Sequence, residues 1–222
     1  MAGPIYYCSV EGNIAAGKST LLRTLAAKNL ANVAIWEEPV ELYNSFGSHH
    51  PLDLLYSDPS HEGAVVQLHI IQTMAEYYDR MFKSLPPGVN YVIMERSMLS
   101  SYVFILLMKS FQYITDFQQS FLVNTVKQCL KKFNYNRVSV IPGKVFYIGT
   151  DVHTCTSRAI QRARNNEATF TDLEPYLSEL ENKYAHFLEA YRKKFGDSSV
   201  YYATSQTPEE QVNELLYFIT QQ

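Results

Sequence analysis

The feature that most constrains this chain is a glycine-rich stretch near its N-terminus. Residues 12–20 read G-N-I-A-A-G-K-S-T and match the pattern G-x-x-x-x-G-K-[ST]. In that pattern backbone N–H groups cradle phosphates, the lysine reaches the outer phosphates and the hydroxyl meets magnesium. The residues expected to bind the phosphates are Gly12, Asn13, Ile14, Ala15, Ala16, Gly17, Lys18, Ser19 and Thr20.

The context of this stretch favours a phosphate site over a glycine-rich turn that binds nothing. An apolar, β-prone run at 5–10 precedes it, and a helical pattern at 19–29 follows. In a strand, loop and helix arranged in this order, the loop amides and the helix dipole point at one anion.

Short apolar runs alternate with longer helical patterns along the whole chain. The expected strands are Ile5–Val10, Val33–Glu37, Tyr91–Met94, Lys144–Ile148 and Val200–Ala203. Helices are expected near 18–29, 62–84, 98–109, 115–132, 151–165, 173–195 and 208–220. The alternation predicts an α/β fold, a parallel sheet with helices on both faces, and ligands at the carboxyl ends of the strands.

Composition bounds the organisation of the chain. With 222 residues and 46% hydrophobic residues, we expect a single domain over 1–222. A net charge of −3 argues against a surface that holds a nucleic acid polymer.

Cys8, Cys129 and Cys155 lack metal spacing and read as thiols in a reducing compartment. We expect no secretory or transit peptide and no membrane span, hence a cytoplasmic or nuclear protein.

Charged residues follow two of the expected strands. Glu38 ends the second strand before Pro39, and it is either a base for a hydroxyl that attacks a phosphate or a solvated strand-end carboxylate. Glu95 follows the third strand, at the place where phosphate-loop enzymes keep an acid for magnesium. Arg96 could neutralise charge on a transferred phosphoryl group, and the alternative is a surface Glu–Arg pair.

Three arginines gather after the fourth strand. Arg158 and Arg162 share one helical face, and Arg164 lies near the expected helix end. Because like charges repel, they suggest either an Arg-rich lid that closes over ATP phosphates, at about 158–172, or a solvated basic face.

Taken together, these motifs resemble those of the deoxyribonucleoside kinases, a family that includes deoxycytidine, deoxyguanosine, mitochondrial thymidine and insect multisubstrate enzymes. The resemblance rests on the glycine loop, Glu38-Pro39-Val40, Tyr56-Ser57-Asp58-Pro59, Gln67, Glu95-Arg96-Ser97 and the run from Arg162 to Glu167. It implies a phosphate-loop kinase with a five-stranded parallel sheet, usually a homodimer packed through a helix bundle. The implied reaction moves the γ-phosphate of ATP, with Mg²⁺, to the 5′-hydroxyl of a deoxynucleoside for nucleotide salvage and DNA synthesis.

The resemblance also assigns roles to single positions. Glu38 corresponds to the base on the 5′-hydroxyl, and Arg96 to the support of that hydroxyl and the phosphate. Glu95 corresponds to an acid associated with magnesium, which Ser19 also meets. Tyr56 and Glu167 correspond to the pair that grips the 3′-hydroxyl, and Gln67 to the amide that pairs with the nucleobase, as its donor and acceptor permit.

The nucleobase preference follows from two further positions. Family members that favour deoxycytidine or purines carry an Arg–Asp pair where this chain has Met74 and Ser101. This replacement implies a roomier pocket that takes the 5-methyl of thymine, and hence thymidine, with deoxycytidine tolerated. Tyr43 stands where a tryptophan is common, and Phe104 is a candidate for stacking on the base. Adenine contacts are expected at Thr204, Ser205 and Gln206.

The same motifs are compatible with two other functions. A nucleoside monophosphate kinase such as thymidylate kinase shares the loop and the fold. A non-catalytic nucleotide-binding module would use the loop alone.

Overall fold

The computed structural model describes residues 5–47, 49–132, 139–162, 170 and 172–221. Five strands form one parallel sheet in the order β2-β3-β1-β4-β5. Their bounds are β1 Tyr6–Gly12, β2 Val33–Trp36, β3 Tyr91–Glu95, β4 Lys144–Ile148 and β5 Val200–Tyr202. The predicted parallel sheet flanked by helices is therefore confirmed.

The register of the central strands brings the functional sequence motifs to one edge. Val10 of β1 is paired with Glu95 of β3, and Gly12 with Ile148 of β4. The glycine loop therefore leaves the sheet beside the residue that ends β3. This is the edge at which parallel α/β sheets bind their ligands.

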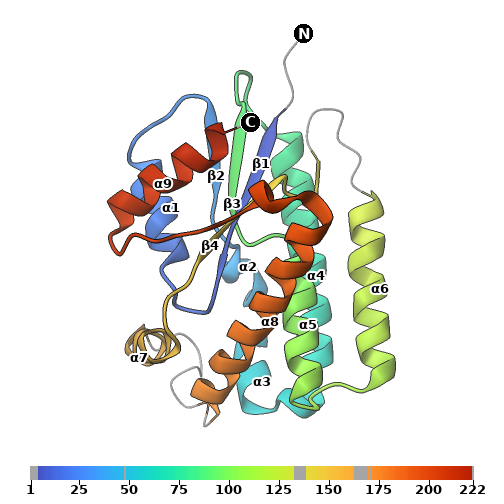
Figure 1. Ribbon diagram of the computed structural model, residues 1–222. Helices are drawn as coiled ribbons and strands as arrows, with labels where there is room; N and C mark the ends of the chain where they lie inside the picture. Colours follow the sequence, from blue (N-terminus) through green and yellow to red (C-terminus); the bar gives the residue numbers. More distant parts are fainter. Residues whose placement is uncertain (1–4, 48, 133–138, 163–169, 171, 222) are drawn as a thin grey trace.

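Helices cover both sides of the sheet. In Figure 1, α1 and α9 lie on one side, and α4, α5, α6 and α8 lie on the other. The bounds are α1 Lys18–Ala26, α2 Val40–Tyr43, α3 Pro51–Ser57, α4 Pro59–Lys83, α5 Ser100–Ser110, α6 Asp116–Lys132, α7 Val152–Arg162, α8 Leu173–Phe195 and α9 Pro208–Thr220, with a short 3₁₀ turn at Asp197–Ser199. Among the residues described, no helix has both the length and the apolar character that crossing a bilayer requires.

Two short helices between β2 and α4 were not expected. No helix was expected at 40–57, and α2 and α3 span only 4 and 7 residues there. Helix α4 begins at Pro59 rather than near 62, because the side chain of Asp58 accepts a hydrogen bond from the N–H of His61 and proline is favoured at the first helical position. These helices carry Tyr43 and Tyr56 to the edge where the strands end.

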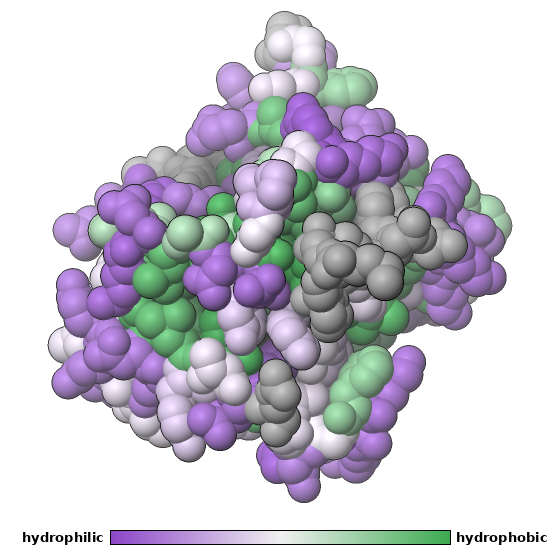
Figure 2. All heavy atoms as spheres, turned by 90° about the horizontal axis from the view of Figure 1, so that it is seen from above, coloured by the Kyte–Doolittle hydropathy of each residue, from purple (hydrophilic) through white to green (hydrophobic). Residues whose placement is uncertain are grey.

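The opposite end of the sheet has a different character. Figure 2 views the end at which the strands begin, and hydrophobic side chains gather there in patches among hydrophilic ones. A second cavity of about 800 Å³ lies at this end, lined in part by Ile5, Ile141 and Phe218. None of the predicted site residues in the described part of the chain lines it.

Candidate active site

A cavity of about 950 Å³ opens at the carboxyl ends of the strands. It brings together most of the residues that the sequence analysis selected from distant parts of the chain. Those lining it are Ile14, Ala15, Ala16, Gly17, Lys18, Ser19, Thr20, Glu38, Tyr43, Tyr56, Gln67, Met74, Glu95, Arg96, Ser101, Phe104, Arg158, Arg162, Ser205 and Gln206. A cavity of this size with convergent polar groups is typical of a ligand site.

The glycine loop is held in shape by the side chain of Lys18, which donates to carbonyls of the loop backbone. Lys18 lies folded along the loop, and its Nζ donates to the carbonyls of Gly12 at 3.3 Å and Asn13 at 2.7 Å. Burial lowers the pKa of Lys18 to about 8, and the nearby charge of Arg96 acts in the same direction. A phosphate beside Lys18 would favour its charged form.

Glycine is required at both ends of this loop. Gly12 has φ +149°, and a Cβ there would lie 2.6 Å from the carbonyl oxygen of Ile148. Gly17 has φ +105°, and its missing Cβ would lie 4.0 Å from Nη1 of Arg158. The first of the predicted lid arginines therefore lies directly beside the loop.

Ser19 and Glu95 are the residues that could hold a magnesium ion. The Oγ of Ser19 donates to Oε1 of Glu95 at 3.1 Å, so the two oxygens lie side by side under the loop. Magnesium prefers oxygen ligands and is usually held by one or two protein oxygens, with waters and substrate phosphates completing its shell. This pair fits that requirement, although no group of three His, Cys, Asp or Glu side chains in the described residues forms a closed metal site.

Glu38 and Arg96 form the charged centre of the cavity. Nε of Arg96 donates to Oε2 of Glu38 at 3.1 Å, and the two side chains are 4% and 19% exposed. Burial opposes the charge of Arg96, but Tyr184, Glu38 and Glu11 hold its pKa above the ordinary value. The guanidinium therefore stays charged at any working pH. Glu95 and Arg96 are 6% and 3% exposed, so these neighbours do not form the plain surface Glu–Arg pair that the sequence left open.

The backbone of Arg96 adopts an unusual conformation. Its φ of +63° lies in the left-handed region, which is uncommon for residues other than glycine. Its N–H donates to the carbonyl of Val10 at 3.0 Å, and its carbonyl accepts from the hydroxyl of Tyr78 at 3.1 Å. Such outliers cluster at functional sites, where the surrounding structure fixes them.

The residues that α4 and α5 place at one end of the cavity are buried. Gln67, Met74 and Ser101 are each at most 3% exposed. The hydroxyls of Tyr43 and Ser101 are buried and have no hydrogen-bond partner among the described residues. A ligand in the cavity could supply the partner that each hydroxyl lacks.

Two aromatic residues at this end are engaged by neighbours. The ring of Tyr56 lies 5.6 Å from the ring of Phe170. The Cζ atom of Arg96 lies 4.8 Å from the ring centroid of Phe104, which is cation–π distance. Phe104, the candidate for stacking on a base, is thus also a support of the arginine.

Some predicted residues have other positions. Gly12 and Asn13 belong to the loop but do not line the cavity, and Asn13 points away from it, donating from Nδ2 to the carbonyl of Leu177 at 2.9 Å. Thr204 also lies outside the lining, and its N–H donates to Oε2 of Glu214 at 3.2 Å. Arg164 and Glu167 lie outside the described residues, together with most of the predicted lid.

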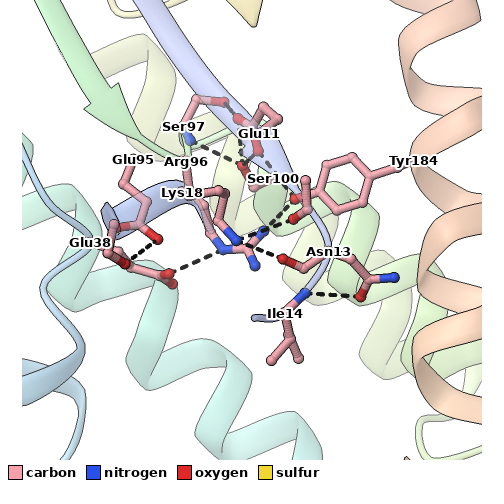
Figure 3. Close-up of polar contacts among 12 residues, drawn as sticks. Glu11, Asn13, Ile14, Lys18, Glu38, Glu95, Arg96, Ser97, Ser100 and Tyr184 are labelled. Carbon is pink, nitrogen blue, oxygen red and sulfur yellow. Dashed lines mark hydrogen bonds and ion pairs between the residues drawn. The ribbon is translucent and has the colours of Figure 1, made fainter. Parts of the chain in front are cut away.

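The hydrogen-bonded group behind Arg96 was not predicted from the sequence. It consists of Glu11, Ser97, Ser100 and Tyr184, which Figure 3 shows around the guanidinium. Glu11 was not recognised because it lies near the end of an apolar strand. Tyr184 was not recognised because it lies in the apolar stripe of a long helix. The polar residue at the end of β1 was the only available signal.

Comparisons with known proteins identify the family of this chain. A family model described as deoxynucleoside kinase matches residues 8–216. A probable deoxycytidine kinase of fowlpox virus is 32% identical over 181 residues, which is 81% of this chain and 70% of that protein. The mitochondrial thymidine kinase 2 of Homo sapiens is 31% identical over 160 residues, 71% of this chain, and the match spans 56% of that enzyme.

A solved structure shows the same fold. It is a deoxyadenosine kinase from M. mycoides with dCMP and a flexible dCDP bound, similar with a TM-score of 0.72 and 19% sequence identity. The similarity covers 95% of this chain and 97% of that one, and the fold is that of a phosphate-loop kinase. Because the family model matches nearly the whole of this chain, the chain belongs to the deoxynucleoside kinase family.

Proposed function

We propose that the protein transfers the γ-phosphate of ATP to the 5′-hydroxyl of a deoxyribonucleoside, with a preference for thymidine. The observation that carries the proposal is the buried pair of Glu38 and Arg96, joined at 3.1 Å in the same cavity as the glycine loop. A carboxylate of this kind can take the proton of an attacking hydroxyl. The charged guanidinium and Lys18 can then stabilise the phosphoryl group during transfer.

The remaining residues have supporting roles in this proposal. The loop from Gly12 to Thr20, with Arg158 and Arg162, holds the phosphates of ATP, and Ser205 and Gln206 face its adenine. Ser19 and Glu95 would hold the magnesium ion, which would supply positive charge next to the phosphates. Gln67 and Tyr56 position the base and the sugar of the nucleoside.

The base role of Glu38 is tested by removing its charge. Glu38→Gln keeps the size of the side chain, so ATP binding should persist while kcat falls at least about 10²-fold. Glu37→Gln is the matched comparison, because the carboxylate of Glu37 pairs with Arg23 at 2.9 Å and the side chains of Arg23 and Glu37 are 66% and 43% exposed. If both variants keep the rate of the wild type, Glu38 is not the base.

Thymidine is proposed because Met74 and Ser101 leave the nucleobase end of the cavity without a charged side chain at those positions. A single methyl group in an apolar pocket is worth only about 1–3 kcal/mol, so deoxycytidine should be phosphorylated more slowly rather than excluded. The decisive measurement is kcat/KM for the four deoxynucleosides. An equal or higher value for deoxycytidine or for a purine would overturn the preference.

Adding thymidine monophosphate to the same panel separates the two alternatives. A nucleoside monophosphate kinase would act on thymidine monophosphate and leave thymidine untouched. A non-catalytic module would bind ATP without turning over any acceptor.

We also propose that the protein is a homodimer. Phe117 and Phe121 lie one turn apart on α6 and are 79% and 50% exposed, as an apolar contact between two helix surfaces requires. Phe117→Glu combined with Phe121→Glu should give a monomer by light scattering. Tyr217→Glu, an exposed position on α9, should not change the mass.

The compartment is proposed from the thiols. All three cysteines are free, as expected for a protein of the cytoplasm or the nucleus, where thiols stay reduced.

A further inference from the structure

Glu11 is a buried carboxylate for which the proposed chemistry has no use. It lies near the end of β1, is fully buried and does not line the cavity. Its Oε1 accepts from Oγ of Ser97 at 3.0 Å and from Oγ of Ser100 at 2.8 Å. Its Oε2 accepts from the hydroxyl of Tyr184 at 3.1 Å. Burying a carboxylate is costly, so this arrangement calls for a role.

The contacts of Tyr184 connect Glu11 to the active site. The Tyr184 hydroxyl donates to Glu11 and accepts from Nη1 of Arg96, as the dashed lines in Figure 3 show. A hydroxyl has a single proton to donate. Since the hydroxyl uses that proton in its hydrogen bond to Glu11, its lone pairs remain available to accept from the guanidinium.

In addition to the ring of Phe104, two hydrogen bonds therefore hold the guanidinium of Arg96 from two sides. Glu38 accepts from Nε on one side, and Tyr184 accepts from Nη1 on the other. The two contacts respond differently to the reaction. When Glu38 takes the proton of the 5′-hydroxyl it loses its charge, and its attraction for Arg96 weakens. The contact with Tyr184 does not depend on that proton.

We propose that Tyr184, oriented by Glu11, is a positioning residue that fixes the guanidinium of Arg96 while Glu38 changes its charge. The inference rests on the proposed function, in which Glu38 is the base and Arg96 faces the phosphoryl group. The main chain of Arg96 is already fixed by Val10 and Tyr78, so the side chain is the part that needs an anchor. Small errors in the position of such a group reduce rates strongly.

Tyr184→Phe tests this with little change in packing, because only the hydroxyl is removed. We expect kcat for the best deoxynucleoside to fall at least about 10-fold, with KM for ATP within about 2-fold of the wild type. Tyr191→Phe is the matched control. It lies on the same helix, is also buried, and its hydroxyl donates to the backbone carbonyl of Pro142, far from Arg96 in the hydrogen-bond network. It should lower the melting temperature without lowering kcat.

A double-mutant cycle decides whether Tyr184 acts through Arg96. If it does, adding Tyr184→Phe to Arg96→Ala should cost less than about 2-fold in the single-turnover rate. If the second change lowers the rate as much as it does in the wild type, Tyr184 acts independently of Arg96 and the inference is wrong. The same holds if Tyr184→Phe alone leaves kcat unchanged.

Glu11→Gln extends the test to the second residue. Its effect on kcat should disappear in the Tyr184→Phe background, because both changes release the same anchor. An effect that persists there, or a change in KM for ATP, would mean that Glu11 acts on the adjacent glycine loop instead. Failure of the wild type to phosphorylate any deoxynucleoside would overturn the proposed function itself, and is thus distinct from these outcomes.

Discussion

Replacing either of two adjacent serines at the start of α5 by alanine should change the free energy of unfolding, but in opposite directions. Ser101 is 2% exposed, and its hydroxyl has no partner among the described residues. An unpaired buried polar group costs about 1–3 kcal/mol, so Ser101→Ala should stabilise the free protein by about that amount. Ser100 is equally buried, but its hydroxyl lies 2.8 Å and 2.7 Å from the two carboxylate oxygens of Glu11. Ser100→Ala removes a hydrogen bond to a charged group and should cost about 1.5–3 kcal/mol.

The assay is thermal and urea unfolding without ligand. In a domain of this size about 1 kcal/mol corresponds to about 2–4 °C, so the two variants should melt on opposite sides of the wild type. Helix propensity favours alanine equally in both variants, and therefore cancels in the comparison. The reasoning is refuted if Ser101→Ala loses stability as Ser100→Ala does, because the hydroxyl of Ser101 would then already be paired.

Ligand binding adds a second readout for Ser101. If its hydroxyl is left for the nucleoside, saturating thymidine should raise the melting temperature of the wild type more than that of Ser101→Ala. An equal shift in both proteins would mean that the hydroxyl does not contact the ligand.

Three further outcomes are expected. Gly12→Ala places a Cβ 2.6 Å from a strand carbonyl and should cost at least about 2 kcal/mol in urea unfolding, whereas Gly143→Ala, with its nearest atom at 3.8 Å, should stay within about 0.5 kcal/mol. Met74→Arg buries a cation at a 3% exposed position and should lower kcat/KM for thymidine at least about 10-fold relative to Met74→Leu; equal values would remove Met74 from the pocket. Burial raises the pKa of Cys8 to about 12, so at pH 8 iodoacetamide should modify the partly exposed Cys129 first. Mass spectrometry measures the order of labelling, and earlier labelling of Cys8 would contradict this expectation.

The fold could be predicted from the sequence because its signals are local. Each strand is a short apolar run, and the glycine loop fixes the order of strand, loop and helix around Gly12. Helices α2 and α3 escaped detection because segments of 4 and 7 residues show too few turns for a helical period. The start of α4 at Pro59 depended on the capping side chain of Asp58, which the periodicity of the helix does not register.

The candidate site could be predicted where a residue belongs to a motif. Glu95 ends a strand, Glu38 and Arg96 follow strands closely, and parallel topology brings the three to one edge. Tyr184 has no such signal, because it is separated from Glu11 by 173 positions along the chain. Only the tertiary packing of α8 against α5 brings it to the guanidinium.

The side chain of Asn13 ties the glycine loop to a distant helix. Its Nδ2 reaches the carbonyl of Leu177 on α8 at 2.9 Å, and its Oδ1 accepts from the N–H of Ile14 at 2.9 Å. A segment rich in glycine and alanine would otherwise lose much conformational entropy when an anion settles into it. Because the hydrogen bonds of Asn13 order the loop during folding, this entropy is not lost again when the phosphate binds. More of the attraction between the amides and the phosphate therefore contributes to the binding free energy.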